Sequence, residues 1–208
     1  VAIPGKAAKF VARNPELAAA VAAAIVAINK VPEKVKIEAA KGIWKSWDDL
    51  RDAGYSEKAL LQLSKGTTNL DNLADAMKRS NHVPGAPASF FKDGPEGEAW
   101  LTAHLKGSQP QVRVLTDGCV EICNSTNVRI IDNLLDGVAH ESKVGFKFLT
   151  PEMERQIRSD AHLVTIGSIK GAHWHFLASA HTSKLGADKR VLDLLDELGI
   201  PYTIHPPA

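Results

Sequence analysis

The sequence lacks a strong excess of charge of either sign. Its 208 residues contain 25 Lys and Arg against 24 Asp and Glu, which gives a net charge of +1. A protein that binds nucleic acid only by neutralising phosphates would be more basic. The balance therefore argues against a purely electrostatic binder, and it suits a hydrolase that gathers carboxylates around a metal.

Cysteine is also scarce, since Cys119 and Cys123 are the only two in the chain. On one extended strand they would lie about 13 Å apart, at about 3.3 Å per residue, which is too far for a disulfide. We therefore expect free thiols, in a reducing compartment or during a short passage through an oxidising one.

Long apolar runs are missing as well. The longest, Leu17 to Ile28, is dominated by alanine and is shorter than the roughly 20 residues that span a bilayer. No signal peptide is recognisable, and the chain begins at Val1 without an initiator Met. We expect it to be a piece of a longer protein.

Two parts of different character divide the chain. Residues 1–87 are expected to form an all-helical module, with helices near 32–53, 56–65 and 70–80. The Ala-rich run and two tryptophans of this module suit a transient contact with a membrane or a receptor during entry into a cell. The alternative is a small bundle that serves as a spacer. The Pro- and Gly-rich stretch 81–97 is expected to join the two parts.

Residues 88–208 show an alternating pattern that predicts an α/β domain, with one mixed sheet flanked by helices. The expected order is α-β-β-β-α-β-α-β. The segments are a helix at 95–107, strands within 111–124, 128–135 and 138–145, a helix from Thr150, a strand at 172–179, a helix ending at Gly199 and a strand at 202–205.

The strongest local pattern is a charged hairpin. Asp136-Gly137 is a two-residue turn signal, and the register it sets places Asp132 opposite Glu141. Glu141 and Lys143 are two residues apart on one strand, so they share a face. Two opposed acids repel each other, and a cation between them would remove the repulsion. The alternative is a solvated face whose charges form surface ion pairs of little value.

These residues suit phosphodiester hydrolysis. Asp132 and Glu141 offer the hard oxygen ligands that Mg²⁺ or Mn²⁺ prefers, and a metal-bound water loses its proton more easily. Lys143 can orient that water or meet the charge that develops on the phosphate.

The pattern also resembles a known family. Asp132, the hairpin and Glu141-Ser142-Lys143 look like the signature of the PD-(D/E)XK, or restriction-endonuclease-like, nucleases. The wider stretch, about residues 95–205, resembles the nuclease toxin domains of bacterial polymorphic toxins of the contact-dependent growth inhibition and Rhs type. The residue before Asp132 is Ile131, where the name of the signature has proline. Many members of the family also lack this proline.

This resemblance implies an αβββαβ core and a metal-dependent endonuclease that acts on DNA or RNA, with tRNA among the substrates. It also implies a cognate immunity protein. Such a toxin is delivered as part of a larger secreted or cell-surface protein and acts in the cytoplasm of the target cell.

Further residues are candidates for the same site. Gln156 lies on the helix that follows Lys143, where the family often has a polar residue, and Glu98 is a candidate third metal ligand. For Gln156 the alternative is a solvated helix residue, and for Glu98 it is a first-turn glutamate that interacts favourably with the helix dipole. The candidates for gripping phosphates, each otherwise a surface charge, are Arg155, Arg158, Lys184, Lys189 and Arg190.

Histidine gives two alternatives. His173 and His175 have a spacing that zinc sites use, but Cys119, Cys123 or His140 would have to complete the ligands, and no CxxC or HExxH motif is present. Zinc is therefore not expected. A metal-independent ribonuclease could use His173 or His175 with His181 and Lys184.

The remaining alternative for the whole chain is a non-enzymatic, two-module binding or adaptor protein.

Overall fold

The computed structural model describes residues 46–65, 73–74, 76, 88–116, 119 and 128–207. The chain divides into two compact units, Val1–Asp48 and Asp49–Ala208. Most of the helical module expected at residues 1–87 lies outside the described residues, so that prediction and its boundary stay predictions. The expected helix at 56–65 is present as α4 (Glu57–Lys65), and the hydroxyl of Ser56 accepts from the Ala59 amide at 3.1 Å. No helix in the described ranges combines the length and apolarity that crossing a membrane requires.

One mixed sheet organises the described part of the second unit. Strands β2 (Gln109–Leu115), β3 (Val128–Leu135) and β4 (Val138–Val144) form an antiparallel meander. Strand β5 (Gly171–Ser179) is parallel to β4. Strands β6 (Tyr202–Ile204) and β1 (Phe90–Phe91) pair in parallel with different stretches of β5.

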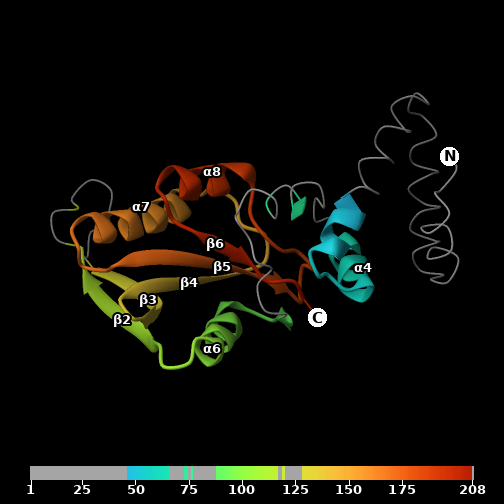
Figure 1. Cartoon of the computed structure of the whole chain (residues 1–208), viewed down its shortest axis with the longest axis horizontal. Coiled ribbons are helices and arrows are strands. Elements are labelled where there is room, and N and C mark those ends of the chain that lie inside the picture. Colours follow the sequence, from blue (N-terminus) through green and yellow to red (C-terminus); the bar gives the residue numbers. More distant parts are fainter. Residues whose placement is uncertain are drawn as a thin grey trace, which may run out of the picture. The chain divides into compact units, whose positions relative to one another are not determined.

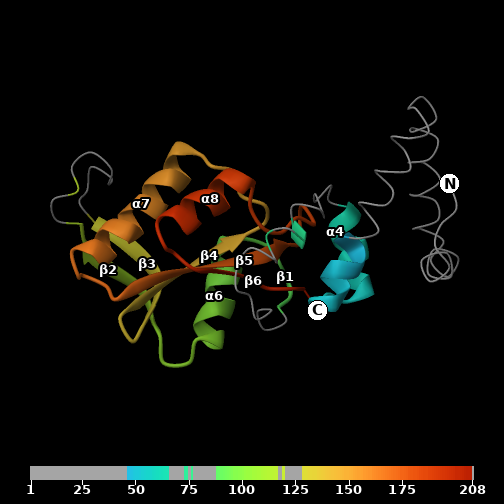
Figure 2. The ribbon, with the colours of Figure 1, turned by 45° about the horizontal axis from the view of Figure 1, so that its top comes forward.

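Helices cover both faces of this sheet. Figures 1 and 2 show α6 (Gly94–His104) on one face, and α7 (Pro151–Thr165) and α8 (Lys189–Glu197) on the other. Each helix begins at a capping residue whose side chain accepts a hydrogen bond from a backbone N–H of the first turn; the caps are Asp93, Thr150 and Asp188, respectively. The predicted α/β architecture with flanking helices is confirmed. The two-residue strand β1 was not predicted.

The turn between β3 and β4 has the expected form. Asp136 and Gly137 both have left-handed backbone angles, with φ of 52° and 87°. Such a pair matches the right-handed twist of the strands it joins. Pairing starts at Leu135 and Val138 and continues to Asn133 and His140, which is the register that the sequence predicts.

The expectation of free thiols is wrong. Cys119 is disulfide-bonded, and Cys123, the only other cysteine, lies outside the described residues. The sequence argument assumed one extended strand, but β2 ends at Leu115 and the Cys119 amide donates to the Thr116 carbonyl in a turn. A disulfide is typical of proteins that spend time in an oxidising compartment.

Gly97 fixes the distance between α6 and the sheet. A methyl group added at Gly97 would lie 2.5 Å from Val144 Cγ2 and 3.1 Å from Leu177 Cδ1. Gly97→Ala should therefore destabilise the fold by about 1–3 kcal/mol through overpacking, as measured by urea unfolding. Gly94→Ala in the same helix is the control, because nothing lies within 4 Å of the added methyl group. Equal stability of the two variants would contradict this account of the packing.

Candidate functional site

Alternation along β4 divides its side chains between the two faces of the sheet. Ser142 and Val144 face α6, because both approach Gly97 of that helix. Glu141 and Lys143 consequently face α7. On the neighbouring strand β5, Trp174 faces the same way, and its indole N–H donates to Asp160 of α7 at 3.0 Å.

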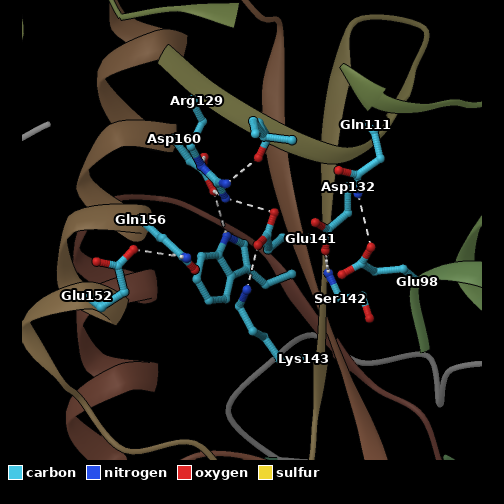
Figure 3. Close-up of polar contacts among 12 residues, drawn as sticks. Glu98, Gln111, Arg129, Asp132, Glu141, Ser142, Lys143, Glu152, Gln156 and Asp160 are labelled. Atoms are coloured by element: carbon cyan, nitrogen blue, oxygen red, sulfur yellow. Dashed lines mark hydrogen bonds and ion pairs between the residues drawn. The ribbon is translucent and has the colours of Figure 1, made fainter. Parts of the chain in front are cut away.

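On the α7 face, four charged groups form a buried ion network. Glu141 pairs with Lys143 at 2.5 Å and with Arg129 at 2.8 Å, and Arg129 also pairs with Asp160 at 2.8 Å. The ammonium of Lys143 lies 4.9 Å from the ring centre of Trp174. These side chains are between 2% and 12% exposed, so solvent screens their interactions weakly. Figure 3 shows them gathered beside β4.

The two acids of the network differ in their protonation behaviour. Burial alone would raise the pKa of Glu141, but Lys143 and Arg129 outweigh it and hold that pKa below its usual range. Burial raises the pKa of Asp160, which has one cation and the repelling charge of Glu141 beside it. Burial would lower the pKa of Arg129, but Glu141 and Asp160 raise it. Glu141 is therefore the acid that stays ionised.

Asp132 lies at an interruption of the sheet. The pairing of β3 with β4 ends at Asn133, one pair before the expected Asp132–Glu141 pair, and the pairing with β2 omits Asp132 and Gln111. Gln111 has φ of 52°, which is uncommon for a residue with a side chain. The carboxylate of Asp132 accepts the backbone N–H of Ser142 at 2.8 Å instead of joining a regular cross-strand pair.

Glu98 lies near this interruption, on α6. Its carboxylate accepts from the side-chain amide of Gln111 at 3.0 Å, and its charge helps to raise the pKa of Asp132. In Figure 3, Asp132 and Glu98 are on one side of the β4 ribbon, and Glu141 is on the other. The three predicted carboxylates thus lie around β4, but they do not share one side of the strand.

Asp132 titrates far from the usual range of a carboxyl. Burial, followed by the charge of Glu141, raises its pKa to about 7, although Lys143 and the Ser142 amide act in the opposite direction. Burial makes the ionised form of this carboxyl costly, and a cation bound beside it would favour ionisation. Perturbed carboxyls of this kind are common at functional sites.

The net charge of the ionisable groups around β4 also favours a bound cation. Four carboxylates (Glu98, Asp132, Glu141 and Asp160) stand against three cations (Arg129, Lys143 and Lys147, which interacts with Lys143), which gives −4 + 3 = −1 when all are ionised. A bound cation would offset this charge. Within the described residues, however, these carboxylates are not already gathered at metal-ligand spacing. A bound cation would have to draw them together, with Glu141 loosening its pairing to Lys143.

The titration of Asp132 predicts a pH dependence of stability in the metal-free protein. Its folded pKa of about 7 exceeds its unfolded value of about 3.9, so the folded state holds the proton more tightly between these limits. Stability should therefore fall as pH rises from about 4 to about 7. Asp132→Asn should be more stable than wild type by on the order of 2–4 kcal/mol above pH 7, with the difference vanishing near pH 4. Urea unfolding in EDTA across this range measures it, and a difference independent of pH would contradict the assignment.

The other predicted residues make side-chain contacts of their own. Gln156 is on α7, and its amide donates to Glu152 at 3.4 Å. The basic residues of the two helices pair with acids of their own segments: Arg155 with Glu152, Arg158 with Glu154, Lys189 with Asp193 and Arg190 with Asp188. Lys184 is half-buried in the segment before α8. A phosphate-binding role for these five stays a prediction.

Sequence reasoning missed Arg129 and Asp160. Asp160 carried a usable signal, because it is three residues from both Ile157 and Leu163, which are buried on α7. A charged residue within an apolar helical stripe needs a buried partner of opposite charge. Nothing local in the sequence identifies that partner as Arg129, which is 31 residues away.

Histidines gather on the opposite face of the sheet, the one that α6 covers. His140 is the register partner of His173, and the rings of His140, His173 and His175 stack or tilt against one another at 4.4 to 5.6 Å. Burial lowers the pKa of all three, and that of His140 falls to about 4. His181 is exposed and is not among these rings, so the predicted His181 mechanism gains no support from the geometry.

No protein-family model, curated protein or solved structure matches the chain.

Proposed function

We propose that residues 88–208 form a metal-dependent nuclease of the PD-(D/E)XK type, which hydrolyses phosphodiester bonds of DNA or RNA. The observation that carries the proposal is the excess negative charge of Glu98, Asp132 and Glu141 around β4, beside the buried amine of Lys143. The order from α6 to β5 is helix, three strands, helix and strand, and it supports the αβββαβ core that the family resemblance implies.

The carboxylates fit a hard divalent cation in their chemistry and their charge. Asp132 and Glu141, with Glu98 as a third ligand, would hold Mg²⁺ or Mn²⁺ through oxygen atoms. When bound, such an ion supplies a water that loses its proton near neutral pH and neutralises charge on the phosphate.

Lys143 would act on the substrate directly. Its ammonium lies over Trp174, which would keep it on the α7 face after Glu141 turns to the cation. A preorganised cation stabilises the charge that develops on a phosphate in the transition state. Arg129 would act indirectly, because its contacts with Glu141 and Asp160 hold the Glu141 carboxylate in place.

We further propose that the chain is part of a bacterial toxin effector. A nuclease that acts in the cytoplasm of a target cell would also harm the cell that makes it, so a cognate immunity protein is the expected partner. An acidic interface on that partner would speed its association with the basic residues proposed to contact nucleic acid. Residues 1–87 would contribute to entry.

The test is a cleavage assay on the full chain. Plasmid DNA and total tRNA are incubated with the protein in Mg²⁺ and, separately, in EDTA. Loss of either substrate in Mg²⁺ alone is the expected result. Activity that survives EDTA would move the chemistry to the histidines, and no cleavage with Mg²⁺ or Mn²⁺ would favour a non-enzymatic binding module.

A further inference from the structure

The histidine cluster on the α6 face includes none of the carboxylates of the proposed nuclease site. His140 comes from β4, and His173 and His175 come from the adjacent parallel strand β5. One ring nitrogen from each lies within 4.8 Å of the others. The β4–β5 register thus brings His140 to metal-ligand spacing with His173, which is 33 positions away in the sequence. The His-x-His spacing of His173 and His175 does not by itself predict this third ligand.

The distances suit a tetrahedral ion. Nδ1 of His140 and Nε2 of His175 are 3.0 Å apart and face each other. Two nitrogens on one tetrahedral zinc, each about 2.0–2.1 Å from the metal, are about 3.3 Å apart. An ion would therefore replace the hydrogen bond between these two nitrogens, with both rings turning so that their lone pairs converge on it.

On two of the three rings, the second nitrogen already has a partner of the kind that orients metal ligands. Nε2 of His173 contacts the Thr203 hydroxyl at 2.8 Å, which leaves its Nδ1 for a metal. Nδ1 of His175 contacts Nε2 of His205 at 2.9 Å, which leaves its Nε2. Histidine ligands in metal sites almost always have such a second partner, which fixes the tautomer and the ring orientation.

From these contacts we propose that His140, His173 and His175 form a transition-metal site, with Zn²⁺ as the ion it would take. His173 is half-buried and the other two are at most 9% exposed, so the ion would enter past His173. The three ligands leave a fourth position for water. The ion would join β4 to β5 on the face opposite Glu141, and the inference does not depend on the nuclease proposal.

Calorimetry with Zn²⁺ on the chelator-treated full chain, with the disulfide kept oxidised, tests this site. We expect one ion per chain, a higher Tm with Zn²⁺, and the absorption bands of a tetrahedral ion when Co²⁺ replaces it. His140→Gln and His173→Gln should each weaken Zn²⁺ binding by more than about ten-fold. His181→Gln is the matched control, because that ring is exposed and outside the cluster.

His173→Gln decides the outcome if His140→Gln fails to fold, because His173 is the least buried of the three. Circular dichroism of the metal-free variant confirms that it is folded. The proposal is overturned if wild type binds no Zn²⁺ at millimolar concentration. It is equally overturned if folded His173→Gln binds Zn²⁺ as tightly as wild type or as His181→Gln.

Discussion

Glu141→Gln should lower Mg²⁺-supported cleavage by about 10³-fold or more, since a bound metal contributes several kcal/mol to transition-state stabilisation. The substitution keeps the shape of the side chain and removes the charge that holds the cation. Glu141 is the acid whose pKa stays low, so it is ionised and able to bind metal near pH 7. Cleavage is measured with saturating enzyme at a temperature where the variant is folded.

The control for Glu141→Gln must separate lost chemistry from lost stability. Asp160→Asn serves this purpose, because Asp160 shares Arg129 with Glu141 and is equally buried. It should keep Mg²⁺-dependent cleavage while folded, because it changes the ion network without removing a proposed metal ligand. If Asp160→Asn loses as much activity as Glu141→Gln, Glu141 acts through the ion network and not as a metal ligand.

Arg129→Met should destabilise the protein by about 3–5 kcal/mol, because removing one partner leaves a buried charge uncompensated. Asp160 would then have no cation, and Glu141 would have only Lys143. The midpoint of urea unfolding measures the change, at a pH where both acids are ionised in the unfolded chain.

A surface pair provides the comparison for Arg129→Met. Arg158 pairs with Glu154 at 2.9 Å, but these side chains are 37% and 42% exposed. Arg158→Met should cost less than about 1 kcal/mol, as exposed ion pairs do. Similar losses for Arg158→Met and Arg129→Met would contradict the view that burial makes the network important.

Local signals in the sequence predicted most of the sheet. The apolar and β-branched segments gave β3, β4 and β5, and Asp136-Gly137 gave the turn and its register. Residue type decides these features, because alternation and turn preferences act within a few residues. The sequence therefore located Glu141 and Lys143 correctly as neighbours on one face, and they lie 2.5 Å apart.

Features that depend on distant or unusual backbone were not predictable in the same way. Nothing about glutamine signals the left-handed φ of Gln111 that accompanies the interruption at Asp132. The disulfide of Cys119 was missed because the strand was assumed to continue beyond Leu115. The partnership of Arg129 and Asp160 arises only when α7 packs on the sheet.

Direct binding of Mn²⁺ tests the central claim, that the hairpin carboxylates hold a hard divalent cation. The metal-free full chain is titrated with Mn²⁺, and the free ion is followed by electron paramagnetic resonance. We predict a bound ion in wild type and in His173→Gln, with binding weakened by more than about ten-fold in Asp132→Asn and in Glu141→Gln. Binding that is absent from wild type, or unchanged in both carboxylate variants, would contradict the account.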